Sequence, residues 1–420
     1  MNTYRKPLFW GMVLLLAILM GCAACLGGYI VFGQPLITSP DQHGLITYTQ
    51  FTDEPGLNNM QSTIVALKYE QKKYFDQRDT DKTIAISERV IALDPDNPTE
   101  YFDNAYIYRH LAERKTSLGD YMDLLKKSLA YADKGISLAP KNGDLYLQRS
   151  YTLITLSNGY AYRADRDYLN RQALEDMKKG IALGNSIPVA EKNLVADNVE
   201  LQDCDSAMSE AIRQATAEPA GSKDEPSGAT MLEGVYLCKG DYQKALEYHM
   251  ANLKKFNRTD KDCGCEGVTA MYLYQLGKTD DAYNMVNQAL IEKPNYVGSR
   301  YFIRAAIEFD RGEYDKALED AEYAEGSSWA FGTFRNYIEG LNAERLGHTQ
   351  EAITKLQYVE ATMNENYNFA TRRAHAELEK LGAVPLVVTP SVHLSTTPEP
   401  PASSPDLNTV PTYSPNVPAQ

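Results

Sequence analysis

The chain has 420 residues and carries 42 lysines and arginines against 56 aspartates and glutamates, a formal net charge of −14. This acidic balance argues against nucleic-acid binding, which needs a basic surface, and against a polybasic patch that binds anionic lipid. It is typical of the solvated surface of an elongated array of helices.

The N-terminus predicts a membrane anchor. Residues 8–32 form an apolar run that is longer than the roughly 20 residues needed to cross a bilayer. Arg5 and Lys6 precede this run, and no other Lys or Arg occurs before Lys68. By the positive-inside tendency, residues 1–7 stay in the cytoplasm and the rest of the chain lies outside it. We therefore expect a single-pass protein of the cell membrane with an extracytoplasmic repeat domain.

Two other interpretations of this segment stay open. Residues 19–22, Leu-Met-Gly-Cys, resemble a bacterial lipobox, in which Cys22 is lipidated after cleavage before it. Against this, residues 23–32 stay apolar where such proteins usually become polar. A cleavable signal peptide would release a soluble product, but its apolar run is usually only about 7–15 residues. All three interpretations put the repeats outside the cytoplasm.

Residues 33–60 lack helical periodicity and are expected to form a spacer, after which the chain repeats. The segment 90–97, Val-Ile-Ala-Leu-Asp-Pro-Asp-Asn, returns as Gly-Ile-Ser-Leu-Ala-Pro-Lys-Asn at 135–142 and in part at 180–185. Residues that recur 45 positions apart are Leu93, Leu138 and Leu183, Tyr101 and Tyr146, and Tyr106 and Tyr151. A fixed period of this size predicts a stacked repeat architecture. These repeats are long, and we expect long helices around 101–116 and 121–138 with a turn at Gly119 and Asp120.

A shorter period governs the second half. Turn glycines recur at Gly240, Gly277, Gly312 and Gly347, and each is followed five residues later by an alanine, at Ala245, Ala282, Ala317 and Ala352. Two of the glycines are followed two residues later by a tyrosine, at Tyr242 and Tyr314. In these segments the chain resembles the tetratricopeptide repeat (TPR) family, a helix–turn–helix unit of about 34 residues. The resemblance covers residues 63–381 and is strongest over 230–360.

The pattern has a physical reading that supports the resemblance. Glycine adopts a positive φ and ends the first helix, and a small alanine lets two helices approach closely. Pro95, Pro140 and Pro294 follow helical stretches that they cannot continue. We expect residues 61–383 to form an all-α, α-α superhelix, a TPR-like solenoid of about seven or eight antiparallel helix pairs, with a final helix near 369–381. Its single transmembrane helix would lie at the N-terminus.

The resemblance also implies a binding surface. The first helix of each TPR pair lines the inner face, and in this register four aromatic residues point into a groove there: Tyr274, Phe302, Phe309 and Tyr337. Aromatic side chains of this kind suit protein or peptide recognition. The alternative is that the four rings pack between repeats as core residues. Replacing Tyr274 and Tyr337 by Ala would spare thermal stability in the first case and lower it in the second.

The cysteines outside the apolar run are Cys204, Cys238, Cys263 and Cys265, an even number that suggests disulfides in an oxidising compartment. In an array of helical hairpins, the start of one second helix lies near the end of the next first helix. We therefore expect a disulfide between Cys204 and Cys238. Cys263 and Cys265 form a local disulfide, a redox pair or free thiols.

No catalytic or metal-binding motif is recognisable. The six histidines are scattered, and the chain contains no phosphate-binding glycine loop and no nucleophile motif. Two cysteines without a nearby histidine make a poor zinc site. We expect neither an enzyme nor a bound metal or cofactor.

Residues 384–420 are rich in Pro, Ser and Thr and contain no Lys or Arg, which predicts a disordered tail. The function expected for the whole chain is a non-enzymatic, membrane-anchored TPR scaffold that binds proteins or peptides on the extracytoplasmic side. One alternative is a lipoprotein-type module that binds a glycan or peptide, and another is a structural cell-surface protein that acts through its tail. The sequence does not define the oligomeric state.

Overall fold

The structure is a computed structural model, and it describes residues 59–184, 188–217, 228–292, 298–325, 332–363 and 368–392. The chain divides into Met1–Ile46 and Thr47–Gln420, and all described residues belong to the second unit. The apolar run at 8–32, the spacer up to residue 58 and the tail beyond residue 392 lie outside the described residues. Among those that are described, no helix is long and apolar enough to span a bilayer.

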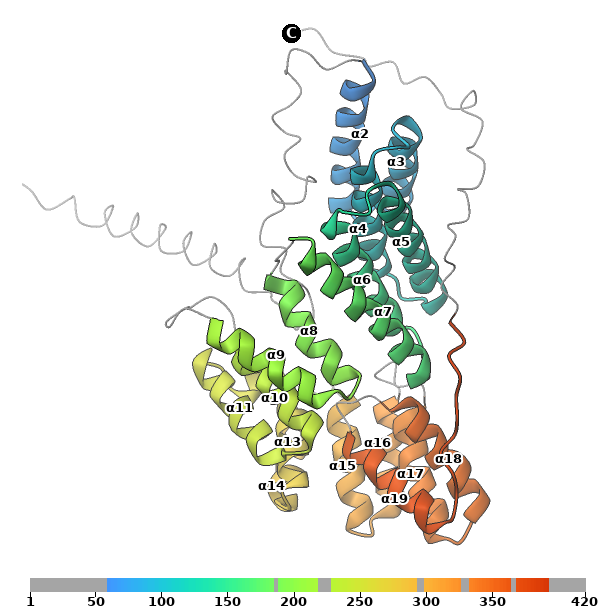
Figure 1. The fold of residues 1–420 in the computed structure, drawn as a ribbon. Coiled ribbons are helices and arrows are strands. Elements are labelled where there is room, and N and C mark those ends of the chain that lie inside the picture. Colours follow the sequence, from blue (N-terminus) through green and yellow to red (C-terminus); the bar gives the residue numbers. More distant parts are fainter. Residues whose placement is uncertain are drawn as a thin grey trace, which may run out of the picture. The chain divides into compact units, whose positions relative to one another are not determined.

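The described residues form helices joined by turns and short connections, and they contain no β-strand (Figure 1). The helices pack as antiparallel pairs of neighbours in the chain. The pairs are α2 (Asn59–Asp76) with α3 (Thr80–Leu93), α4 (Pro98–Ala112) with α5 (Leu118–Leu138), α6 (Gly143–Ser157) with α7 (Arg163–Ala182), and α8 (Pro188–Glu200) with α9 (Cys204–Ala217). Those of the second half are α10 (Gly228–Lys239) with α11 (Tyr242–Lys255), α13 (Glu266–Gln275) with α14 (Thr279–Glu292), α15 (Gly298–Asp310) with α16 (Tyr314–Glu325), and α17 (Thr333–Arg345) with α18 (Thr349–Thr362). The short α12 (Asp260–Cys263) precedes α13, and α19 (Asn368–Lys380) follows the last pair.

This arrangement confirms the predicted all-α array of helix pairs with a final helix. The four turn glycines of the second half all have φ between +72° and +78°. The four alanines that follow them are completely buried. Each first helix therefore ends at a left-handed glycine, and each second helix packs closely through an alanine.

The 45-residue repeat of the first half has a local cause that recurs at two of its copies. Asn97 and Asn142 cap α4 and α6 by accepting a hydrogen bond from a backbone N–H two residues later. The Tyr101 hydroxyl donates to the carbonyl of Pro95 at 2.8 Å, and the Tyr146 hydroxyl donates in the same way to the Pro140 carbonyl at 3.2 Å. The repeated residues thus set the turns that enter α4 and α6.

One local prediction was wrong. Gly119 and Asp120 do not form the turn between α4 and α5 but lie in the first turn of α5, which Ser117 caps through the backbone N–H of Asp120. A serine at this position satisfies a free N–H of the helix start, so the helix begins before the glycine.

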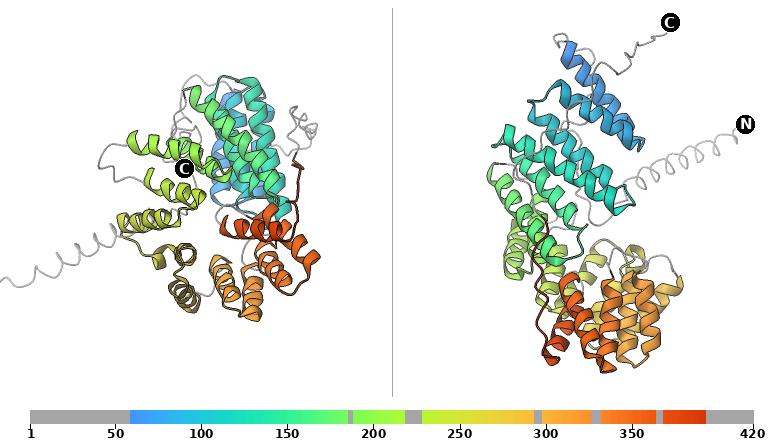
Figure 2. Two further views of the ribbon diagram at one scale, coloured as in Figure 1. Left: turned by 60° about the horizontal axis from the view of Figure 1, so that its bottom comes forward. Right: turned by 90° about the vertical axis from the view of Figure 1, so that its right-hand side faces the viewer.

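After α19 the chain leaves helical structure and runs back toward earlier repeats (Figure 2). Gln357 on α18 donates to the Val384 carbonyl at 2.6 Å. Asp165, at the start of α7, accepts hydrogen bonds from the backbone N–H of Ser391 and, at 3.2 Å, from that of Val392. Residues 384–392, which the sequence assigns to the tail, are thus held at both ends. We call them the strap.

A second contact joins α7 to the C-terminal part of the chain. Arg166 on α7 donates to the carbonyls of Thr362 and Met363 at the end of α18, at 3.1 and 3.2 Å. A guanidinium at the C-terminal end of a helix interacts favourably with unpaired carbonyls and with the helix dipole. Residues about two hundred positions apart in sequence are therefore in contact.

Candidate interaction surface

The last helix, α19, packs on α18 and places side chains of its first turns against the first helices of the second half, α10, α13, α15 and α17. The aromatic residues predicted to form a groove belong to the surface that these first helices present. Phe302 on α15 stacks on Phe334 of α17 with ring centroids 4.2 Å apart, and it meets Tyr337 edge-on at 5.6 Å. Phe302 and Tyr337 have no exposed surface.

Phe369 of α19 fills the space between these rings. Its centroid lies 5.9 Å from that of Tyr274, 5.8 Å from that of Phe302 and 6.4 Å from that of Tyr337. These three rings come from three successive first helices. The small residues Ala370 and Ala374 are completely buried, so α19 approaches the surface closely.

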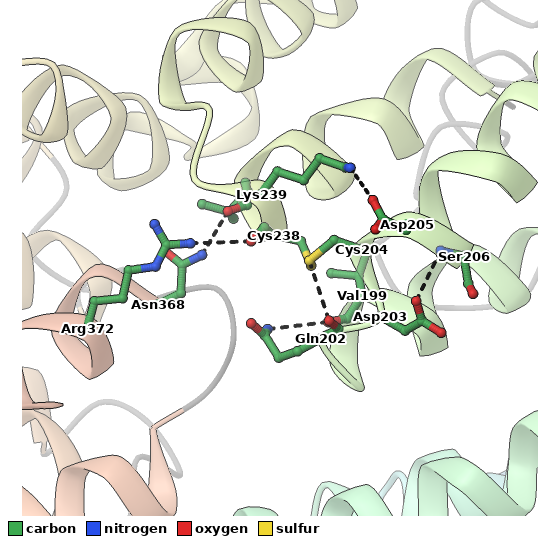
Figure 3. Close-up of a disulfide and its surroundings, with 11 residues drawn as sticks. Val199, Gln202, Asp203, Cys204, Asp205, Ser206, Cys238, Lys239, Asn368 and Arg372 are labelled. Atoms are coloured by element: carbon green, nitrogen blue, oxygen red, sulfur yellow. Dashed lines mark hydrogen bonds and ion pairs between the residues drawn. A yellow bond between two sulfur atoms is a disulfide. The ribbon is translucent and has the colours of Figure 1, made fainter.

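The N-terminal end of α19 is held by polar contacts (Figure 3). Asn368 is buried, donates from its amide to the Leu237 carbonyl at 2.7 Å, and accepts from the Tyr242 hydroxyl at 3.0 Å. Arg372 reaches the Cys238 carbonyl at 3.4 Å, in the space that Gly240 leaves open. The end of α10 therefore supplies backbone acceptors that recognise an amide and a guanidinium.

One turn into α19, Arg373 forms the ionic contact of this interface. It pairs with Asp310 of α15 at 2.8 Å, and its guanidinium lies 5.6 Å from the ring centroid of Phe309. Asp310 also accepts a hydrogen bond from the Tyr274 hydroxyl. Burial and the neighbouring charge of Asp310 raise the pKa of Tyr274, which keeps this hydroxyl protonated as a donor.

The four predicted residues are therefore brought together, but not around an open groove. Phe302 and Tyr337 are core residues, which corrects the groove assignment for these two and agrees with the packing alternative. Tyr274 and Phe309 are half-buried at the edge of α19. The sequence did not predict the roles of Asn368, Phe369 and Arg373, because a final helix shows its amphipathic pattern but not the surface on which it packs.

The disulfide between Cys204 and Cys238 lies beside this interface (Figure 3). It joins the first residue of α9 to the end of α10, with 5.7 Å between the Cα atoms. The start of a second helix thus lies near the end of the next first helix, and the predicted Cys204–Cys238 disulfide is confirmed. Cys265 is also disulfide-bonded, and its partner lies outside the side chains that the structure describes. Cys22 lies outside the described residues.

A second buried polar cluster joins α10 to α13. His249 of α11 lies 3.0 Å from Glu233 and 3.2 Å from Asp260, and the Tyr272 hydroxyl donates to the same Glu233 oxygen at 2.9 Å. Burial lowers the pKa of His249, but the hydrogen bonds and charges of the two carboxylates outweigh it and raise the pKa to about 9. The ring is thus held as a cation between two anions, an arrangement that stabilises the contact between repeats. Nowhere in the described ranges is there a set of His, Cys, Asp and Glu that would hold a metal ion.

No protein-family model matches the sequence, and no curated protein matches it either. The fold matches solved structures. A tetratricopeptide repeat protein from Parabacteroides merdae aligns at a TM-score of 0.51 with 14% identity, covering 66% of this chain and 98% of that one. The type IV pilus biogenesis factor PilW aligns at 0.43 with 15% identity, covering 57% and 96%. IFIT1, solved with a capped RNA, aligns at 0.44 with 13% identity, covering 77% and 73%. The first of these alignments shows a TPR-like fold.

Proposed function

We propose that this protein is a non-enzymatic scaffold that binds proteins or peptides through the first helices of its second half. The observation that carries the proposal is the seating of α19 on that surface. Aromatic rings from three helices surround the Phe369 ring. A backbone carbonyl of α10 binds Asn368, and Asp310 binds Arg373. A surface that recognises a helix by these contacts has the chemistry of a helix-binding site.

We further propose that residues 8–32 anchor the scaffold in the cell membrane and that the repeats lie outside the cytoplasm. The long apolar run and the preceding Arg5 and Lys6 support this topology. The Cys204–Cys238 disulfide supports an oxidising compartment, because thiols in the cytoplasm are kept reduced. Thiol labelling in intact cells tests this location. A membrane-impermeant reagent should label Cys204 and Cys238 only after an impermeant reductant has opened the disulfide. Labelling of both cysteines by a membrane-permeant reagent without reduction, together with no labelling by the impermeant reagent after reduction, would contradict the proposed location.

Mass spectrometry of the N-terminus distinguishes the anchor from its alternatives. An intact N-terminal segment is expected for the membrane-spanning anchor. A lipid on Cys22 would identify a lipoprotein, and a chain that begins after residue 22 without lipid would identify a secreted product.

Site-specific photo-crosslinking in the native membrane tests the binding function. A photoreactive phenylalanine replaces Tyr274 at the edge of α19, and a control variant carries it at Met250, an exposed residue of the second helix α11. The same partner proteins should be captured repeatedly from position 274 and not from position 250. Equal capture from both positions, or none from 274, would contradict a role for this surface.

A further inference from the structure

The interface between α19 and the first helices has two parts with different chemistry. Its apolar part is Phe369, and the buried Ala370, Ala374 and Leu378 continue along the helix in the core that α18 also lines. Its polar part consists of Asn368, which uses both ends of its amide, and Arg373, which pairs with Asp310. A ligand that matches the surface therefore needs an amide, an adjacent aromatic ring and a basic residue one turn later.

The polar part is more extensive than a simple core requires. Asn368 is 5% exposed, yet it makes two hydrogen bonds to α10 and α11 across about 130 residues of sequence. Interfaces that form and dissociate are more polar than permanent cores, and their buried polar groups set specificity. α19 therefore carries the polar groups expected of a helix that binds specifically and reversibly, in addition to the apolar side of a terminal helix.

The position of α19 favours exchange. In an array of repeats each unit is stabilised by its neighbours, and no further helix pair follows α19 to pack on it. The strap that continues the chain is held by hydrogen bonds at its two ends. Local opening draws on such terminal elements first. When α19 leaves, the surface beneath it becomes available, and its three aromatic rings lose their cover.

We propose that α19 is an internal ligand and that the partner of this scaffold is an amphipathic helix of the same chemistry, which takes its place. The inference rests on the proposed function and specifies its partner: an amide–aromatic pair followed four positions after the aromatic by a basic residue. In the absence of such a partner, α19 keeps the surface closed.

The test uses the full-length protein in detergent and a fluorescent peptide of residues 366–382. The variant Arg373→Glu places an anion against Asp310 and weakens the docking of α19, while the surface itself stays intact. Fluorescence anisotropy should show that the peptide binds this variant at least tenfold more tightly than the wild type, because the competing helix is released. Lys380→Glu on the same helix is the matched control, since Lys380 is 65% exposed and pairs only locally with Glu377. It should bind the peptide like the wild type.

A charge swap makes the test specific. Asp310→Arg in the protein should abolish binding of the wild-type peptide and restore binding of a peptide that carries Arg373→Glu. If the protein with Arg373→Glu keeps its helical circular dichroism but does not bind the peptide, α19 is a fixed part of the fold and the proposal is overturned. If that variant loses its helical signal, Arg373→Ala replaces it, because this change removes the ion pair without adding repulsion. Binding of the peptide by Arg373→Ala then supports the proposal, and absence of binding overturns it.

Two further results separate this inference from the proposed function. Light scattering that shows a dimer of the Arg373→Glu protein, with the peptide site already filled, would identify a second copy as the occupant and overturn the proposal. If the peptide does not bind but the same partners are captured reproducibly from position 274, the exchange of α19 is refuted and the scaffold function remains. Peptide binding without any captured partner would refute the scaffold function instead.

Discussion

Replacing Phe302 by Ala should strongly destabilise the second half of the array. Phe302 is completely buried, and its ring touches those of Phe334 at 4.2 Å, Tyr337 at 5.6 Å and Phe369 at 5.8 Å. These neighbours belong to α17 and α19, so the cavity cannot close by the movement of one helix. A buried Phe→Ala change of this kind lowers the free energy of unfolding by about 3–5 kcal/mol.

The matched control is Tyr301→Ala, one position earlier on α15. Tyr301 is half-buried and stacks at 5.2 Å on Tyr323, which is itself 55% exposed. Loss of this pair costs up to about 1.5 kcal/mol beyond the burial of the half-buried ring, so Tyr301→Ala should be less destabilising than Phe302→Ala.

Guanidinium unfolding followed by circular dichroism measures both variants, and hydrogen exchange locates the effect, because an array of repeats need not unfold in one step. Protection should fall in α13 to α19 and stay unchanged in α4 and α5, which make none of the contacts described for α18 and the strap. If Phe302→Ala is no more destabilising than Tyr301→Ala, the ring is not part of the core and our account of the surface is incorrect.

Three further predictions concern buried or bridging groups. The pKa of His249, about 9, lies above its ordinary value of 6.5, so its contribution of up to about 3 kcal/mol is complete below pH 6.5 and is lost as the pH rises through 9. Denaturant unfolding at a series of pH values should show this loss, and His249→Gln should abolish it. Burial raises the pKa of Asp197 to about 8, above an unfolded value of about 3.9, so stability should fall as the pH rises from 4 through 8. Asp197→Asn should therefore raise the melting temperature at pH 8 and leave it unchanged near pH 4; a lower melting temperature at pH 8 would contradict this. Asp165→Ala should release the end of the strap, seen as faster hydrogen exchange there with unchanged exchange in α19. Unchanged exchange in the strap would show that Asp165 does not hold it.

Much of the fold could be predicted because its signals are local. A glycine with positive φ at each turn and an alanine five residues later define one hairpin, and both requirements act within a few residues. The cap and turn residues Asn97 and Tyr101 act over six residues at most, so their recurrence 45 positions later predicts a second copy of the same turn. The Cys204–Cys238 pair follows from the same regularity, since equivalent ends of adjacent pairs lie together in any such array.

Whether the candidate surface is open or covered could not be predicted in the same way. Periodicity shows which side of α15 carries Phe302, but not whether another helix covers that side. The covering helix makes its contacts over 131 positions between Leu237 and Asn368 and over 63 positions between Asp310 and Arg373. No spacing rule connects such positions. The role of α19 therefore became apparent only from the contacts themselves.

The covalent connection of α19 determines what a partner must achieve. A tethered segment acts at an effective concentration that reaches the millimolar range for short links, so a free helix at micromolar concentration competes at a disadvantage of about a thousandfold. The apolar contacts do not overcome this difference, because a partner with the same aromatic and small residues gains the same burial. The balance is therefore set by how well each helix places its polar groups, and Asp310 is the surface residue that pairs with the basic one. It is half-exposed at the rim, where a change of partner charge alters affinity without disturbing the core around Phe302.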